Sequence, residues 1–187
     1  EPVDGYDVIT TINVNIQDIA HHSLLSQLEY YEAEHGCVIV MEVATGEIKA
    51  VSNLGRTSRG TYYEKLNYAV GESHEPGSTF KVASLMAALE DKVIDTSSVI
   101  DTKRGVKNFY GRKIYDSHRG GYGEISVARA LEVSSNIGFA TFIDEGYKEN
   151  PKMFIDRLES FNLKDSIGIS IKGEGKPMIP SPGHKKW

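Results

Sequence analysis

Ser78 and Lys81 lie three positions apart, a spacing that places a hydroxyl and an amine on one face of a helix. The segment that follows, residues 82–89, is apolar on nearly all sides and predicts a buried helix. Lys81 is the only charged residue between Gly77 and Glu90. A buried ammonium tends to lose its proton or to find partners, so the pair could combine a nucleophile with a general base.

This spacing is weak evidence when taken alone, because about one Ser-x-x-Lys match is expected by chance in a chain of this length. Pro76 and Gly77 favour a helix start just before the serine, where unpaired backbone N–H groups attract negative charge. In the alternative interpretation, Ser78 only caps the helix while the Lys81 ammonium reaches solvent. The residues alone leave both interpretations open.

A second polar group, Ser134-Ser135-Asn136, interrupts two predicted helices that are rich in apolar residues. Such a turn would present a hydroxyl and an amide, which could pass on a proton and hold Lys81 in place. The alternative is an ordinary capping turn. Ser160-Phe161-Asn162 has the same spacing, and we interpret it as a helix C-terminus among polar residues.

The composition describes one globular chain of 187 residues, with 40% hydrophobic and 25% charged residues. A net charge of −5 without a basic stripe argues against a nucleic-acid partner. No apolar run approaches the length of a membrane span. The single Cys37 excludes an internal disulfide, and its apolar neighbours predict a core strand residue. The histidines show no ligand spacing, so neither a metal nor a cofactor is expected.

The first third of the chain predicts a small sheet with one long helix. A strand is expected over residues 8–12, and Asn13 or Asn15 could cap a helix that runs to about Glu34, with Gly36 as its stop. Residues 37–44 and 47–53 predict a hairpin. The apolar stripe expected on the helix comprises Ile16, Ile19, Ala20, Leu24, Leu28 and Tyr31. The hairpin turns at Thr45-Gly46, and residues 54–75 are expected to form a surface loop.

The remainder of the chain predicts mainly helices. The buried helix is expected to end near Glu90-Asp91, and residues 95–125 form an irregular excursion with short strands. Further helices are expected at the following ranges: 127–133, 137–145 and 151–161. Residues 172–187 are expected to be extended. The fold class is therefore α/β of the α+β type, with an antiparallel sheet flanked by helices that is incomplete in this chain.

Pro76-Gly77-Ser78-Thr79-Phe80-Lys81 resembles the active-site serine motif of penicillin-binding proteins, in which Ser-x-x-Lys is followed several tens of residues later by Ser-x-Asn. Residues 7–12, 38–51 and 173–180 are similar to further segments of the same transpeptidase domain. The motif is most similar to class B, monofunctional enzymes, with the cell-division branch favoured. The resemblance implies a serine β-lactamase/transpeptidase-like fold and one partial domain over residues 1–187.

The resemblance also implies a role for each motif residue. Ser78 would be the acylated nucleophile and Lys81 its general base, a role that has been disputed in related enzymes. Ser134 would relay the proton, and Asn136 would bind the stem peptide and orient Lys81. The activity would be that of a serine-type D,D-transpeptidase, which forms an acyl-enzyme and passes it to an amine.

The implied partners are peptidoglycan stem peptides that end in D-Ala-D-Ala, β-lactam antibiotics that mimic them, and other cell-wall synthesis or division proteins. The implied location is the periplasmic face of the bacterial inner membrane, with an anchor that is absent from this chain.

The family's third motif, Lys-Thr-Gly or Lys-Ser-Gly, is absent from residues 1–187, where the only Thr-Gly is Thr45-Gly46 in the hairpin turn. In the family this strand supplies an oxyanion-hole N–H, and losing one such donor costs about two to three orders of magnitude in rate. We therefore expect the chain to be the first part of a transpeptidase domain, inactive or nearly so alone. Two alternatives stay open: a serine β-lactamase or β-lactam sensor, and a non-catalytic peptidoglycan-binding or divisome-interaction module.

Overall fold

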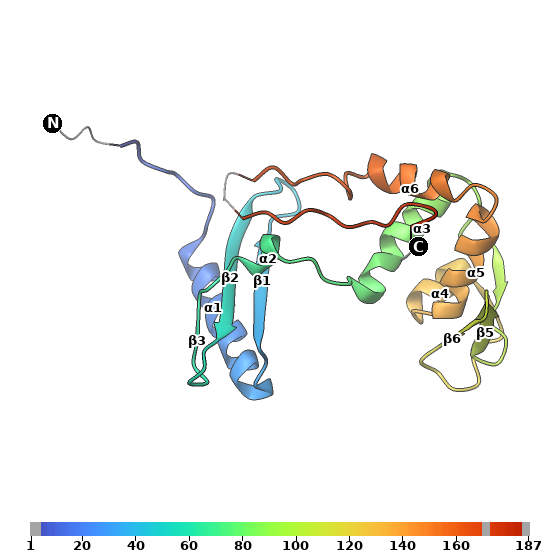
Figure 1. Cartoon of the computed structure of the whole chain (residues 1–187), viewed down its shortest axis with the longest axis horizontal. Coiled ribbons are helices and arrows are strands. Elements are labelled where there is room, and N and C mark those ends of the chain that lie inside the picture. Colours follow the sequence, from blue (N-terminus) through green and yellow to red (C-terminus); the bar gives the residue numbers. More distant parts are fainter. Residues whose placement is uncertain (1–4, 170–172, 185–187) are drawn as a thin grey trace. The chain divides into compact units, whose positions relative to one another are not determined.

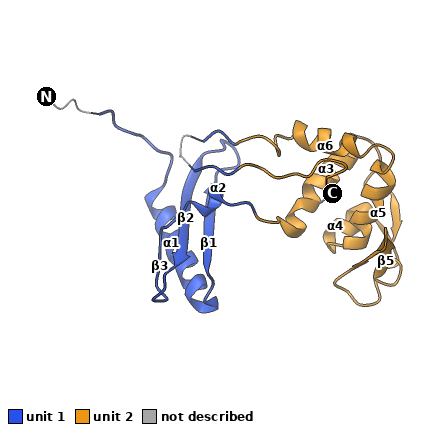
Figure 2. Cartoon of the chain, viewed as in Figure 1, with its two compact units in different colours: residues 1–73, 167–175 blue, residues 74–166, 176–187 orange. Residues whose placement is uncertain are grey.

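The computed structural model describes residues 5–169 and 173–184, and the chain forms two compact units (Figure 2). Unit 1 comprises residues 1–73 and 167–175, and unit 2 comprises residues 74–166 and 176–187. The single partial domain over residues 1–187 stays a prediction. Among the described residues, no helix combines the length and the apolar composition that crossing a bilayer requires.

Unit 1 begins with helix α1 (Val14–Tyr31), whose start the sequence predicted correctly (Figure 1). The Asn13 side chain accepts the backbone N–H groups of Asn15 and Ile16, so two otherwise unpaired donors are satisfied. The predicted end was wrong. Glu32 adopts the left-handed conformation at φ 49° and closes the helix four residues before Gly36.

The buried stripe of α1 is narrower than the sequence predicted. Ala20 and Leu28 are buried, whereas Ile19 and Tyr31 are 67% and 71% exposed. The helix packs on strands β1 (His35–Met41) and β2 (Ile48–Arg56), and these two strands cover only part of its surface. The sequence therefore overestimated how much of the surface of α1 is buried by other elements of unit 1.

The sheet of unit 1 has the strand order β1-β2-β3, all antiparallel, with β3 at Tyr62–Tyr63. The predicted hairpin is confirmed, and Gly46 takes a positive φ of 75° in its turn. The strand predicted over residues 8–12 was wrong, because that segment forms no ladder with a neighbouring strand. Cys37 is exposed, which corrects its predicted core position, because it lies on edge strand β1.

Residues 54–75 carry more regular structure than the predicted loop, because they include the end of β2, all of β3 and the short helix α2 (Tyr68–Gly71). At the other end of the chain, residues 173–184 form no helix or strand, as predicted for the extended tail. The other residues of that tail, 172 and 185–187, lie outside the described residues.

Unit 2 is built on four helices (Figure 1): α3 (Phe80–Glu90), α4 (Val127–Glu132), α5 (Asn136–Tyr147) and α6 (Pro151–Ser160). Two short antiparallel pairs fill the predicted excursion: β4 (Val99–Asp101) with β7 (Glu124–Ser126), and β5 (Val106–Phe109) with β6 (Arg112–Tyr115). All four helices lie where the sequence predicted them, because Ser126 and Pro151 mark starts that depend only on local chemistry.

Helix α3 contacts both α5 and α6, and it forms the centre of unit 2. Its Ala87 and Ala88 are fully buried, so the small side chains allow neighbouring helices to approach closely. The helix is not buried all round as predicted, because Val82 and Met86 are 52% and 47% exposed. One apolar side of α3 therefore faces away from the core of unit 2.

Asp91 joins the C-terminal end of α3 to two other helices. Its carboxylate accepts the Tyr147 hydroxyl at 2.8 Å and the Arg157 Nε and Nη2 atoms at 2.8 and 2.5 Å. The Asp91 side chain is only 5% exposed. Burial, together with the bond to Asp91, raises the pKa of the Tyr147 hydroxyl well above its usual range, so it stays a donor at neutral pH.

Replacing Asp91 by alanine should destabilise unit 2. The buried Tyr147 hydroxyl would lose its acceptor, which alone costs about 2 kcal/mol of the free energy of unfolding. The measurement is urea unfolding followed by circular dichroism. Asp156→Ala is the control, because its partner Lys152 is 73% exposed and the loss of a surface pair changes little. Equal unfolding midpoints for the two variants would contradict the assigned role of Asp91.

Candidate active site

Ser78 lies in a single 3-10 turn, Gly77–Thr79, that runs directly into α3. Gly77 permits the entry to this turn because it takes a left-handed φ of 59°. The Thr79 hydroxyl donates to the backbone oxygen of Pro76 at 2.5 Å and ties the turn to the preceding residue. Ser78 is exposed. Its hydroxyl can therefore be reached from solvent.

Lys81 lies in the first turn of α3 and is half-buried. Its Nζ atom lies 2.6 Å from the backbone oxygen of Ser134, 2.9 Å from the Ser134 Oγ and 2.7 Å from the Asn136 Oδ1. The Phe139 ring centroid lies 5.6 Å from the same Nζ atom. The structure thus brings Lys81 into direct contact with two other predicted site residues, Ser134 and Asn136, which lie 53 and 55 residues further along the sequence.

The turn between α4 and α5 presents these acceptors. Ser134 adopts a left-handed φ of 53°, a conformation that is costly for a residue with a side chain. Ser135 is the N-cap of α5, and its Oγ accepts the backbone N–H of Gly138 at 2.9 Å. The backbone N–H of Ser135 donates to the oxygen of Ala130. Hydrogen bonds to the end of α4 and to the start of α5 therefore fix the turn on both sides.

The Asn136 amide is oriented by a second contact. Its Nδ2 donates to the backbone oxygen of Tyr115 at 2.9 Å, at the end of strand β6. A carbonyl can only accept, so this bond determines which end of the amide is the nitrogen. The Asn136 Oδ1 is consequently the atom that faces Lys81.

These positions suit both protonation states of Lys81. The Ser134 backbone oxygen and the Asn136 Oδ1 can only accept, so they take two N–H bonds from the amine in either state. As an ammonium, Lys81 donates its third hydrogen to the Ser134 Oγ. As a neutral amine, it offers a lone pair that accepts the Ser134 hydroxyl hydrogen. The Ser134 hydroxyl can therefore relay a proton, giving up its own hydrogen as it takes one from Lys81 or the reverse, without rearrangement of these heavy atoms.

Two opposing effects act on the charge of Lys81. Burial lowers the pKa of its amine below the ordinary value, and the negative charge of Asp116 partly opposes this by raising the same pKa. Burial is the larger effect. The neutral form is therefore more accessible here than for a lysine in water, which is a property that a general base requires.

Ser78 is the predicted site residue that stands apart from this cluster. Among the described residues, no hydrogen bond joins its Oγ to Lys81, although the two residues are one turn apart at the start of α3. The direct contact between nucleophile and base stays a prediction. Hydrogen bonds of this kind are often long in unliganded enzymes and shorten when a substrate binds.

The sequence did not identify Asp116. This carboxylate is 8% exposed and accepts the Ser135 Oγ at 3.0 Å and the backbone N–H of Ile137 at 3.1 Å. Asp116 lies in a segment of short strands and turns, where an aspartate is ordinary. No spacing rule connects it to a turn that begins 18 residues later. The only signal for such a partner is general: the first backbone N–H groups of a buried helix need an acceptor from elsewhere in the chain.

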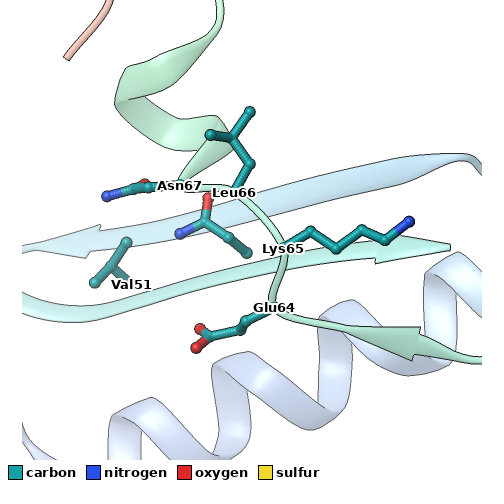
Figure 3. A pocket seen from close by; sticks show the side chains of 6 residues that line it. Val51, Glu64, Lys65, Leu66 and Asn67 are labelled. Carbon is teal, nitrogen blue, oxygen red and sulfur yellow. The ribbon is translucent and has the colours of Figure 1, made fainter. Parts of the chain in front are cut away.

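Two other regions do not contribute to this cluster. The Ser160 hydroxyl donates to the Arg157 backbone oxygen at the end of α6, so Ser160-Phe161-Asn162 forms a helix C-terminus as predicted. A hollow of about 310 Å³ in unit 1 is lined by Val51, Asn53 and residues 64–67, none of which the sequence predicted as catalytic (Figure 3).

Comparison with known proteins gives matches over most of the chain. Residues 36–183 match the family model described as the penicillin binding protein transpeptidase domain. Stage V sporulation protein D of Bacillus subtilis is 26% identical over 95% of this chain and 28% of that protein. Peptidoglycan D,D-transpeptidase FtsI of Escherichia coli is 26% identical over 98% of this chain and 30% of that protein.

A solved structure shows the same fold. The apo structure of the TP domain from Burkholderia pseudomallei penicillin-binding protein 3 superposes with a TM-score of 0.77 at 24% identity. The superposition covers 92% of this chain and 48% of that chain. The predicted fold class is thereby confirmed as part of a transpeptidase fold. The chain spans less than a third of the length of the two curated relatives.

The lowered pKa of Lys81 predicts how stability depends on pH. An unfolded lysine titrates near 10.4, whereas the folded one titrates below that value. Between the two values the unfolded chain binds more protons, so the free energy of unfolding rises with pH. We expect the wild type to gain stability relative to Lys81→Met across this window, as measured by urea unfolding at a series of pH values.

The ¹³C NMR titration of the lysine Cε atoms provides the control. Lys152 should titrate above its ordinary pKa, because its ammonium bonds to Asp156. Lys81 should titrate below it. A Lys81 resonance that titrates at or above 10.4 would show that the three acceptors outweigh burial.

Proposed function

Because the chain belongs to the penicillin-binding protein transpeptidase family, we propose that it takes part in D,D-transpeptidation of peptidoglycan stem peptides. One observation carries the proposal more than any other: the Lys81 amine is held by Ser134 and Asn136 in a half-buried position that lowers its pKa below the ordinary lysine value. This arrangement supplies a base one helical turn from an exposed serine.

In the acylation step, the Ser78 oxygen attacks the carbonyl of the penultimate D-Ala of a stem peptide that ends in D-Ala-D-Ala. The hydroxyl proton passes to Lys81. The tetrahedral intermediate collapses by breaking the peptide bond, and the departing D-Ala amine receives a proton through the Ser134 hydroxyl. The products are free D-Ala and an ester on Ser78.

In the second step, the amine of a neighbouring stem peptide attacks the ester carbonyl. Its proton leaves through the same Lys81–Ser134 pair, and Ser78 regains its hydroxyl hydrogen. A new amide bond then joins the two stems. Asn136 contributes in both steps, because its Oδ1 fixes the amine and its amide is anchored on Tyr115.

β-Lactams are the second class of ligand in this proposal. The Ser78 oxygen attacks the lactam carbonyl and opens the ring, and the ring nitrogen takes the proton that the serine releases. The leaving group stays tethered to the acyl chain, so it obstructs the approach of an acceptor amine. The acyl-enzyme is then long-lived.

The cellular setting follows from the family. We propose action at the periplasmic face of the inner membrane, together with other cell-wall synthesis or division proteins. Two relatives match nearly the whole chain. The cell-division branch that the Glu75–Lys81 motif favours belongs to the same proposal.

Acylation by a fluorescent penicillin tests the nucleophile, using the full gene product that contains these residues. Ser78→Ala should abolish covalent labelling. Lys81→Met should reduce its rate by about 10²–10⁴-fold, the usual contribution of a general base. Ser160→Ala is the matched control and should label like the wild type. Labelling that survives Ser78→Ala would refute the assigned nucleophile.

The alternatives give different results in the same preparation. Turnover of a chromogenic cephalosporin would indicate a β-lactamase, because deacylation by water would then be fast. Binding to soluble glycan that persists in Ser78→Ala, without any labelling of the wild type, would indicate a non-catalytic binding module.

Residues 1–187 taken alone should label at least about 100-fold more slowly than the full gene product. They contain no Lys-Thr-Gly or Lys-Ser-Gly sequence, and the oxyanion donor of that motif is worth about this factor. Rapid stoichiometric labelling of Ser78 in the isolated chain would overturn this expectation.

A further inference from the structure

One buried carboxylate, that of Asp116, forms hydrogen bonds with both sequence neighbours of Asn136. Asp116 Oδ1 accepts the Ser135 Oγ at 3.0 Å and the backbone N–H of Ile137 at 3.1 Å, and Asp116 Oδ2 lies 3.1 Å from the same Ser135 Oγ. The adjacent residue Tyr115 accepts the Asn136 side chain through its backbone oxygen. Two consecutive residues at the end of β6 thus hold three consecutive residues at the start of α5.

The residue directly before the held segment has a conformation that requires support. Ser134 has a left-handed φ of 53°, and such a residue persists only where its surroundings determine it. Asp116 is held in turn, because its backbone N–H donates to the oxygen of Gly105 at 3.1 Å. The support of the turn therefore extends from the β5–β6 region to the atoms that contact Lys81.

The Asp116 carboxylate is stabilised by hydrogen bonds from uncharged groups. Among the described residues no ion pair includes Asp116, and its three short contacts are with a hydroxyl and a backbone N–H. A carboxylate that is 8% exposed is costly to bury, so its partners have to be fixed in place to compensate. The negative charge also lies beside the first turn of α5, where it is favoured by the helix dipole.

We infer that Asp116 is a positioning residue for acylation, which holds Ser134 and Asn136 against the Lys81 amine through its bonds to Ser135 and Ile137. It does not touch the reacting atoms. This inference rests on the function proposed above, because Asp116 would position the groups that hold Lys81, the general base of that reaction. The competing explanation is a purely structural cap of α5.

A set of variants separates these explanations. Asp116→Ala removes both bonds. Asp116→Asn keeps one carbonyl oxygen that can still accept the Ile137 N–H, but it removes the charge. Ser135→Ala keeps the carboxylate and deletes the hydroxyl that links it to the turn. Tyr147→Phe is the matched control, because it loses one buried hydrogen bond elsewhere in unit 2.

The kinetic experiment measures the rate of penicillin labelling at a series of penicillin concentrations, using the full gene product. The concentration dependence separates the reversible binding constant from the first-order acylation constant k2. Asp116→Ala should lower k2 by about 100-fold, the cost of a misplacement near 1 Å. Ser135→Ala should lower k2 by about 10-fold, and Asp116→Asn should recover most of the activity. Tyr147→Phe should leave k2 unchanged. A k2 in folded Asp116→Ala and Ser135→Ala equal to that of the control would overturn the inference.

NMR supplies a readout that does not need acylation. The Asn136 side-chain amide should give one slowly exchanging pair of ¹H–¹⁵N signals in the wild type and in Asp116→Asn. In Ser135→Ala these signals should shift and exchange faster, while the amides of α5 beyond Gly138, whose N–H bonds to the Ser135 Oγ, stay unchanged. Unchanged Asn136 signals in Ser135→Ala would overturn the inference. A wild type that does not label at all contradicts the proposed function instead, and this NMR measurement then still decides the role of Asp116.

Discussion

The contact of the Lys81 amine with Ser134 and Asn136, at 2.6 to 2.9 Å, is the interaction on which the site depends. Burial makes the charged amine unfavourable, the charge of Asp116 partly opposes this effect, and the three oxygens hold the amine in place. The site therefore combines two requirements that oppose each other, a low affinity for the proton and a fixed position. Helix α3 supplies the amine, while the turn between α4 and α5 supplies the acceptors.

The packing of unit 2 explains why this contact can form. Fully buried alanines on α3 allow α5 and α6 to lie close, and Asp91 joins the ends of the same helices through Tyr147 and Arg157. These contacts lie away from the reactive groups. The buried alanines let the helix that bears Lys81 lie close to the helix that begins at the facing turn, whereas the Asp91 contacts stabilise the C-terminal end of α3.

Local chemistry made much of this predictable from the sequence. Capping residues such as Asn13 and Ser126 act within a few residues of their own position, and the helix starts were correct for that reason. The exposure of Ile19 and Cys37 depends on which elements cover them, and the partner role of Asp116 depends on a contact across the turn to α5. Such tertiary facts leave no periodic trace in a sequence.

The separation of 53 residues between Lys81 and Ser134 couples reactivity to folding. In an unfolded chain Lys81 would have the ordinary lysine pKa of about 10.4 and would be almost wholly protonated at neutral pH. Its basic form becomes more accessible when the intervening helices and strands have folded and Lys81 is half-buried against α5. A nascent or damaged chain would thus lack the base that the proposed acylation requires.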